Sequence, residues 1–297
     1  MISLDTALTV TRGAPLSLTH LFASLHPNDQ IFTGVYESER SQEKLIGQIY
    51  RSQTMTSAHL TYLLGLADRD PRDCVVLLEG LIKEAGYWGA KQVVANLQIS
   101  SPLFPHFRQA GFSVLAKQRV FKYEPSANFD TITPNGWRPW HQEDFSAMCG
   151  LYQTLVPPLI QAVEPISRRE AQGLVHYDAS GTLQAYADLV YGPVGVWVLP
   201  VLHPQINEPI GDLLDQLVLD IPKLNKRPVY IASRSYQPWF ESALEAGAIE
   251  TSPEQAVMVR YMTLRQRVKA NYTLSPVENG QPEPTITMTS VNNRRQG

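Results

Sequence analysis

The sequence predicts a mixed α/β (α+β) protein built from two similar halves, each a mostly antiparallel, twisted sheet flanked by helices. The first observation is a repeat, because residues 48–111 match residues 184–247 at a constant offset of 136 positions without an insertion. The second is that this one offset serves a strand, a helix, another strand and another helix. The third is the length of 297 residues, which suits two ordinary domains.

The matching residues are spread over the whole repeated stretch, which indicates a tandem duplication in which each half has its own core. The residues of the first half are Gln48, Tyr50, Leu63, Leu66, Leu77, Leu78, Leu81, Val93, Pro102, Phe104, Ala110 and Gly111. Their counterparts are Gln184, Tyr186, Leu199, Leu202, Leu213, Leu214, Leu217, Val229, Pro238, Phe240, Ala246 and Gly247.

The first half opens with a strand-like run over residues 2–11 and a short helix over residues 15–25 that begins at a proline. Residues 31–36 and 45–51 are β-rich and flank a polar loop, which predicts a hairpin. Residues 58–66 form an almost unbroken apolar run. It is too short for a helix and is typical of a central strand that is buried on both faces.

A polar loop over residues 68–73 comes next, and apolar residues then recur at helical spacing over residues 75–85. Gly86 and Gly89 favour the end of that helix. The remaining predicted elements of the first half are a strand over residues 93–99, a short helix over 103–110 and a strand over 114–123.

The second half repeats this plan after a linker. Residues 125–136 carry two prolines and a glycine without apolar periodicity, which separates a domain over residues 1–124 from one over 137–266. Residues 267–297 lack apolar periodicity and predict a disordered tail. The elements predicted in the second domain are a helix over residues 143–155, a hairpin over 174–177 and 183–191, a strand over 194–202, a helix over 210–221, a strand over 229–233, a helix over 238–246 and a strand over 256–263.

Composition excludes several classes of partner. The net charge of −3 gives no broad attraction to nucleic acid or to an anionic membrane. There is no apolar run of about 18 residues, and the N-terminus lacks a signal pattern. The two cysteines, Cys74 and Cys149, lie in different halves and favour a reducing compartment over a disulfide framework. We expect a cytoplasmic protein that binds neither nucleic acid nor membrane.

The usual catalytic and metal motifs are missing from the sequence. The seven histidines are scattered and the cysteines are single, so no metal site is predicted. The serine-hydrolase elbow, the phosphate-binding P-loop and the dinucleotide glycine motif do not occur.

One resemblance points to a family. Residues 103–123, LFPHFRQAGFSVLAKQRVFKY, resemble the C-terminal helix, Gly-Phe turn and last strand of the GNAT superfamily of acyl-CoA-dependent N-acyltransferases. Residues 58–97, AHLTYLLGLADRDPRDCVVLLEGLIKEAGYWGAKQVVANL, are similar to its central strand, cofactor loop, long helix and next strand. The second half covers the same elements through YIASRSYQPWFESALEAGAI. The resemblance covers most of residues 1–265 and implies two tandem GNAT-like domains.

This fold implies a cleft where two parallel strands splay apart. The pantetheine arm of an acyl-CoA then adds to the strand edge as an extended peptide would, and the pyrophosphate lies at the amides that open the next helix. In the second half the positions that match the family's loop are Gln205, Glu208 and Ile210. In the first half the implied cofactor-binding residues are Leu64, Leu66, Arg69, Arg72, Asp73 and Cys74.

Both copies depart from the family's loop, because every glycine or alanine position in it is lost. Glu208 places a carboxylate near the phosphates and Pro209 removes an amide, so the second copy is poorly suited to the cofactor. In the first copy, Arg69 and Arg72 could replace lost amide contacts by pairing with phosphate. The alternative is that they belong to a solvated surface loop.

The family's usual general acid is also missing. It is a tyrosine four residues before the glycine that ends the helix, and Phe107 and Ala243 occupy that position. Candidate substitutes near the implied cleft are Glu37, His59, Tyr62 and His106. For each of these four residues an ordinary structural role is the alternative.

Two functions stay open. The chain is predicted to be an N-acyltransferase that uses acetyl-CoA or another acyl-CoA, without a metal, and acts in the N-terminal copy on a small-molecule or protein amine. The alternative is an inactive GNAT-like pseudoenzyme that serves as a ligand-sensing or protein-interaction module. The sequence predicts neither the acceptor nor the oligomeric state.

Overall fold

The structure is a computed structural model of the whole chain. It describes residues 1–13, 29–38, 44–52, 55–65, 71–125, 136–166 and 173–262. The helix predicted over residues 15–25, most of the predicted linker and the predicted tail lie outside the described residues. Residues 1–263 form one compact unit.

The first half contains a hairpin, a central strand and two helices in the predicted order. Its elements are β1 (Ile2–Ser3), α1 (Thr6–Arg12), β2 (Asp29–Glu37), β3 (Lys44–Ser52), β4 (Ser57–Leu64), α3 (Pro71–Tyr87), β5 (Gln92–Gln98), α4 (Phe104–Gln109) and β6 (Ser113–Tyr123).

The second half has the same order with a few additional short elements. They are β7 (Arg138–Pro139), η2 (Gln142–Asp144), α5 (Phe145–Leu155), α6 (Pro158–Gln161), β8 (Gly173–Tyr177), β9 (Leu183–Tyr191), β10 (Val196–Leu202), α7 (Ile210–Asp220), β11 (Val229–Arg234), η4 (Pro238–Phe240), α8 (Glu241–Gly247), β12 (Ala248–Thr251) and β13 (Gln255–Tyr261).

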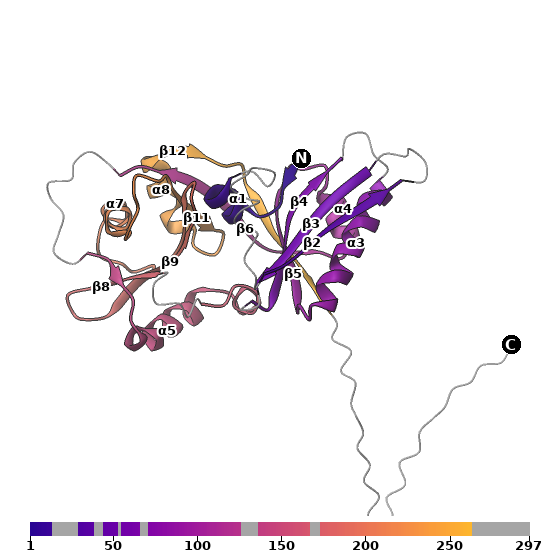
Figure 1. Cartoon of the computed structure of the whole chain (residues 1–297). Helices are drawn as coiled ribbons and strands as arrows, with labels where there is room; N and C mark the ends of the chain where they lie inside the picture. Colours follow the sequence, from indigo (N-terminus) through magenta and orange to yellow (C-terminus); the bar gives the residue numbers. More distant parts are fainter. Residues whose placement is uncertain are drawn as a thin grey trace, which may run out of the picture. The chain divides into compact units, whose positions relative to one another are not determined.

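The strands of the two halves interlock in one continuous sheet (Figure 1). Its order is β2-β3-β4-β5-β13-β6-β11-β10-β9-β8-β7. The last strand, β13, therefore lies between β5 and β6 of the first half, and β6 pairs with β11 of the second half. The domain boundary near residue 124 stays a prediction. Strands from the two sides of that boundary pair with each other, namely β13 with β5 and β6, and β11 with β6.

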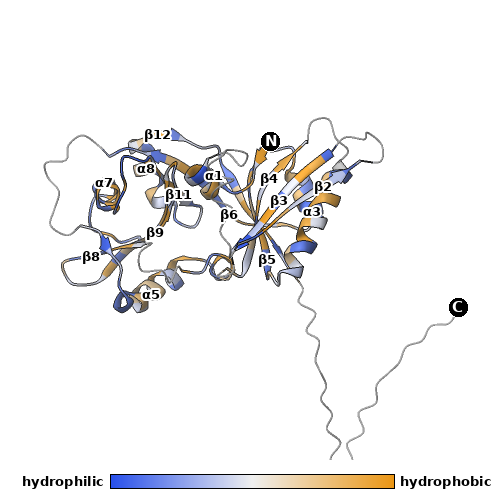
Figure 2. Ribbon diagram, viewed as in Figure 1, coloured by the Kyte–Doolittle hydropathy of each residue, from blue (hydrophilic) through white to orange (hydrophobic). Residues whose placement is uncertain are grey.

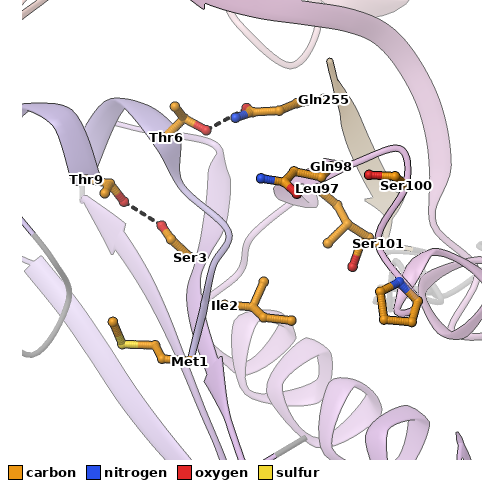
Figure 3. A pocket seen from close by; sticks show the side chains of 11 residues that line it. Met1, Ile2, Ser3, Thr6, Thr9, Leu97, Gln98, Ser100, Ser101 and Gln255 are labelled. Atoms are coloured by element: carbon orange, nitrogen blue, oxygen red, sulfur yellow. Dashed lines mark hydrogen bonds between the residues drawn. The ribbon is translucent and has the colours of Figure 1, made fainter. Parts of the chain in front are cut away.

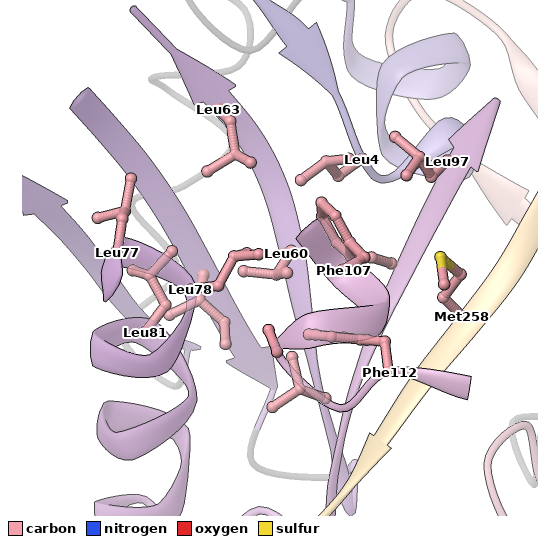
Figure 4. Packing of buried hydrophobic residues seen from close by; sticks show 14 of the residues in the cluster. Leu4, Leu60, Leu63, Leu77, Leu78, Leu81, Leu97, Phe107, Phe112 and Met258 are labelled. Atoms are coloured by element: carbon pink, nitrogen blue, oxygen red, sulfur yellow. The ribbon is translucent and has the colours of Figure 1, made fainter. Parts of the chain in front are cut away.

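Helix α3 covers one face of the first-half sheet, and its apolar stripe explains why (Figures 2 and 4). Leu77, Leu78 and Leu81 pack with buried strand residues in one hydrophobic cluster. The helix can lie close to the sheet because Gly34 and Gly47 face each other across β2 and β3. A Cβ atom at Gly47 would lie 2.7 Å from the side chain of Leu63 and 2.8 Å from that of Leu81, so glycine leaves room for both leucines where they are.

The strand predicted over residues 2–11 is wrong beyond Ser3, because residues 6–12 form helix α1. The β-branched run favoured a strand locally. Asp5 overrides that preference as the N-cap, since its side chain accepts the amide of Leu8 at 2.9 Å. Ala7 and Val10 then pack on a cluster around Trp197 in the second half, which adds tertiary stabilisation to a short helix.

The fold class predicted from the sequence is confirmed: a mixed α/β structure with a mostly antiparallel sheet flanked by helices. Apart from the strand over residues 2–11 and the helix over residues 15–25, the predicted strands and helices of both halves are present, with ends that differ by a few residues. The short elements β7, α6 and β12 were not predicted. Within the described part of the chain, none of the helices is long and apolar enough to cross a bilayer.

Candidate functional site: two strand clefts

Each half contains one pair of parallel strands that runs together briefly and then separates. In the first half β4 and β5 pair from Ser57 and Gln92 to His59 and Val94. In the second half β10 and β11 pair over three residues in the same way, as far as Val198. The sequence predicts ligand binding at these points of separation, since a separated strand exposes unpaired main-chain groups.

In the first half, Leu4 fills the point where the strands separate. Its amide donates to the carbonyl of Thr61 on β4 at 2.8 Å, and its carbonyl accepts the amide of Asn96 on β5 at 2.7 Å. The side chain of Leu4 is 1% exposed and belongs to the same hydrophobic cluster as Leu63 and Phe107 (Figure 4). One residue of the N-terminus thus replaces the missing rungs of the parallel ladder.

The neighbouring residues of the N-terminus continue along the same edge. Ile2 pairs with Leu63 and Ser3 with Tyr62, antiparallel to β4. We call residues Met1–Leu4 the N-terminal segment. The edge that the sequence predicts for an extended ligand is therefore occupied by this segment.

A β-bulge at Thr61 shapes this edge. The pairing of β3 with β4 passes from Gln48 and Tyr62 to Ile49 and Leu60, so Thr61 is an extra residue on β4. Its hydroxyl donates to the Gln48 side chain at 3.0 Å, while its carbonyl accepts Leu4. The bulge allows Leu60 and Leu63 to join the same core cluster although they are three residues apart.

A cavity of about 480 Å³ adjoins the N-terminal segment (Figure 3). Met1, Ile2 and Leu97 supply part of its lining, and the other named groups are neutral and polar. Thr6 donates to the Gln255 side chain at 2.7 Å at its rim. The polar lining residues are Ser3, Thr6, Thr9, Gln98, Ser100, Ser101 and Gln255. Hydroxyl and amide groups of this kind suit a neutral ligand with amides or hydroxyls.

The predicted cofactor loop is described only in part. Leu64 ends β4 and is half-buried, whereas Leu66 and Arg69 lie outside the described residues. Arg72 and Asp73 open α3, with Arg72 exposed. Cys74 is buried in the core, and burial raises the pKa of its thiol to about 11. Only the main chain of Cys74 is therefore available to a ligand.

Among the candidate catalytic residues, His59 lies at the point where β4 and β5 separate. Its Nδ1 atom is 3.5 Å from the Asp5 carboxylate, which is 7% exposed. The ring also lies 5.5 Å from that of Tyr50. A histidine held by a carboxylate is an arrangement that can accept a proton.

The other three candidates lie elsewhere and are not brought together with His59. Tyr62 is buried on β4. Glu37 is exposed at the end of β2, 3.9 Å from the Lys44 ammonium. His106 lies in the last turn of α4, and its buried Nδ1 atom has no hydrogen-bond partner among the described residues.

In the second half a side chain closes the equivalent edge. The Gln237 side chain accepts the amide of Leu202 at 3.0 Å and donates to the carbonyl of Pro200 at 3.1 Å. Gln237 is fully buried. Its amide thus satisfies two main-chain groups of β10 at the positions where an extended ligand would bind.

A buried polar cluster lies next to this second edge. Arg234, at the end of β11, donates to Glu164 at 2.6 Å. Burial raises the pKa values of Tyr152, Tyr186 and Tyr236, so these phenols stay protonated. The Glu164 carboxylate of this cluster is held by Arg234.

The structure also shows where Glu208 and the two residues at the position of the family's tyrosine lie. Glu208 lies 3.2 Å from Nε2 of His176, a histidine that is 1% exposed. Its carboxylate thus has a structural partner. At the position of the family's tyrosine, Phe107 is fully buried and Ala243 is partly buried.

Two functional features escaped the sequence analysis. The N-terminal segment was predicted as a strand, but no pattern indicated that it pairs with β4. Gln237 is a single polar residue in a loop, and the repeat places Ser101 at its counterpart. In the described residues, no group of three His, Cys, Asp or Glu side chains could hold a metal ion.

Comparison with solved structures gives the same fold over most of the chain. A tandem GNAT protein from the clavulanic acid biosynthesis pathway is 17% identical, with a TM-score of 0.47, over 86% of this chain and 91% of that one. A functionally unknown conserved protein from Staphylococcus epidermidis is 12% identical, with a TM-score of 0.52, over 81% of this chain and 97% of that one. A GCN5-related N-acetyltransferase from Kribbella flavida is 14% identical, with a TM-score of 0.47, over 75% and 88%.

No protein-family model matches the chain, and no curated protein matches its sequence. At these identities the likeness concerns the fold alone. The chain shares the fold of the Staphylococcus epidermidis protein over most of its length.

Proposed function

We propose that the chain is an acyl-CoA-dependent N-acyltransferase whose N-terminal copy binds the acyl donor. The observation that carries this proposal is the separated edge of β4, which already accepts an extended main chain at Thr61, Tyr62 and Leu63. The pantetheine arm has two amides on an extended chain and can use the same main-chain groups.

The start of α3 suits the phosphates of the donor. This 17-residue helix opens directly after the β4 loop, so its free amides and its dipole favour an anion there. Arg72, exposed in the first turn, adds a guanidinium that pairs well with phosphate. The negative charge of Asp73 opposes phosphate binding. The positive charge of Arg72 therefore contributes more to phosphate binding here than an arginine would beside a glycine-rich loop.

The transfer itself requires a neutral amine and a base. The amine nitrogen attacks the thioester carbonyl, the carbon–sulfur bond breaks, and CoA leaves as a thiolate. His59, held by Asp5, takes the proton that the amine loses. Water then protonates the thiolate, because Phe107 replaces the tyrosine that would otherwise do so.

A second candidate function is a non-catalytic module that binds a ligand without turnover. Its specific support is the loss of the acid at both Phe107 and Ala243, together with the internal pairing of both strand edges. A non-catalytic module would bind the same ligand as the acyltransferase but would not transfer its acyl group.

Calorimetric titration of the full chain with acetyl-CoA and with free CoA tests the proposal. We expect saturable binding of about one ligand per chain, because Gln237 closes the second edge. Absence of heat at millimolar ligand would contradict the proposal. Binding of acetyl-CoA without thiol release in the presence of a panel of amines would favour the non-catalytic module.

A further inference from the structure

The N-terminal segment and an extended ligand would need the same atoms of β4. The Thr61 carbonyl already accepts the Leu4 amide, and the edge beyond it pairs with Ile2 and Ser3. A main-chain acceptor that is satisfied inside the chain is unavailable to a second donor in the same direction. Binding along this edge therefore requires that the segment leave.

The segment can leave without disturbing the helix that comes after it. Its contacts with the sheet are the pairing of Ile2 and Ser3 with β4 and the two main-chain hydrogen bonds of Leu4, and Met1 is 57% exposed. Helix α1 is anchored independently, because Asp5 caps its start. The far end of α1 is held by the second half, where the Val194 amide donates to the Thr11 carbonyl at 3.0 Å. Release can thus stop at Asp5, which keeps its place beside His59.

The residues of the segment also fit such a role. Leu4 is buried in the hydrophobic cluster that also contains Leu63 and Phe107, and Ile2 packs against that cluster. Ser3 contacts the Thr9 hydroxyl through its own hydroxyl, next to the 480 Å³ cavity (Figure 3). The cavity is lined by Met1, Ile2 and Ser3 of the segment, so a ligand can contact the segment there before the segment is displaced.

We propose that the N-terminal segment is a resident competitor for the β4 edge, which a ligand can occupy only after the segment has left. The proposal rests on the proposed function, since the ligand is the pantetheine arm of an acyl-CoA. Ligand affinity then equals the affinity of the open edge multiplied by the fraction of molecules in which the segment is released.

Two variants are designed to release the N-terminal segment, and one double cysteine variant is designed to hold it against β4. Leu4→Asp places a charge where Leu4 is buried, and deletion of residues 2–4 removes the pairing of Ile2 and Ser3 with β4 and leaves only Met1 before Asp5. Ser3 and Tyr62 are cross-strand neighbours, and their replacement by cysteines allows a disulfide that holds the segment in place. Val114→Asp adds the same charge at an exposed position and is the matched control for Leu4→Asp.

The measurement is calorimetric titration of the full-length variants with acetyl-CoA. If the open state is populated at about 1–10%, release should raise affinity about 10- to 100-fold, and Val114→Asp should not. The oxidised Ser3→Cys/Tyr62→Cys variant should lose binding, and reduction should restore the affinity of the same protein. Each single cysteine variant serves as the reference for its own substitution.

The outcomes separate the two proposals. Equal affinity in the wild type, the released variants and the oxidised double variant would overturn the competitor role and leave the proposed function standing. Absence of binding in all of them, including both released variants, would overturn both. If Leu4→Asp does not fold, the deletion variant and the reversible disulfide still decide the question.

Discussion

The two strand clefts are closed in different ways, and the difference indicates which one can open. In the first half the closing groups are main-chain atoms of a terminal segment that ends in an exposed residue, Met1. In the second half they belong to Gln237, a fully buried side chain held within the fold. Releasing the N-terminal segment breaks its pairing with β4 and uncovers the buried Leu4 site, whereas moving Gln237 leaves two buried main-chain groups of β10 without their partner.

The starts of the two halves show the same contrast. Both begin with a two-residue strand, but β1 pairs with β4 inside the cleft, while β7 pairs with β8 at the edge of the sheet. In β7, Arg138 forms a bidentate contact with Asp144, at 2.7 and 2.8 Å. The first half thus uses its terminal strand to fill the cleft, and the second half uses its strand to extend the sheet.

The largest expected effect concerns Gln237. Gln237→Ala leaves the Leu202 amide and the Pro200 carbonyl without their partner in a buried site. Each orphaned group costs about 1–3 kcal/mol, so we expect the unfolding free energy to fall by about 2–6 kcal/mol. Urea denaturation of the full chain measures this loss.

The matched control is Gln205→Ala, an exposed glutamine in the same half. It should change the unfolding free energy by less than about 0.5 kcal/mol. If Gln237→Ala and Gln205→Ala had equally small effects, the second edge would not depend on the amide. The second cleft would then be as free to open as the first.

The next largest effect on stability concerns Asp144, whose carboxylate binds Arg138 of β7. Arg138 lowers the pKa of the Asp144 carboxyl below its usual range, helped by hydrogen bonds from the Tyr177 hydroxyl at 2.6 Å and from the His141 amide. A carboxyl with a lowered pKa contributes stability above its unfolded pKa of about 3.9 and loses it as pH falls further. Asp144→Asn should therefore cost about 1.5–3 kcal/mol at pH 7.

The difference between the wild type and Asp144→Asn should shrink as the pH is lowered from about 5 to about 2. Urea unfolding at several pH values measures it, with the exposed neighbour Glu143→Gln as control. A difference that does not depend on pH would show that the carboxylate charge is not what holds β7. Strands β1 and β7 would then differ in their pairing but not in the electrostatic contacts that hold them.

The sequence was sufficient for the elements and for the duplication, because both rest on local apolar spacing. It could not give the exchange of β13 into the first half, since β13 and β6 have similar patterns and either could pair with β5. It also missed α1, where an Asp5 cap and packing on the second half outweigh β-branched residues.

The candidate site shows the same limit. The implied cleft could be located from the resemblance, and His59 was among the residues chosen for it. The groups that close each cleft could not be predicted, because Leu4 and Gln237 reach their partners through contacts that are distant in sequence. Main-chain pairing of this kind leaves no residue-type signature.

The smallest expected effect concerns the phosphate end of the first cleft. Arg72→Ala should weaken acetyl-CoA binding by about 1–3 kcal/mol, or about 5- to 150-fold, the usual value of a charge-assisted contact. Arg72→Lys should fall between the wild type and Arg72→Ala, because an ammonium keeps the charge but loses the planar fork. Raising the salt concentration in the titration should narrow the gap between wild type and variant, since the contact is exposed.

The counterpart in the second cleft is Glu208→Ala, which should leave acetyl-CoA affinity unchanged. The substitution deprives His176 of a partner at 3.2 Å, so its effect belongs to stability and not to binding. Equal losses of affinity at Arg72 and Glu208 would mean that neither loop holds the phosphates. A loss of acetyl-CoA affinity in Arg72→Ala alone would instead assign the acyl donor to the first cleft, which the N-terminal segment closes. The buried Gln237 amide would then remain a fixed part of the fold.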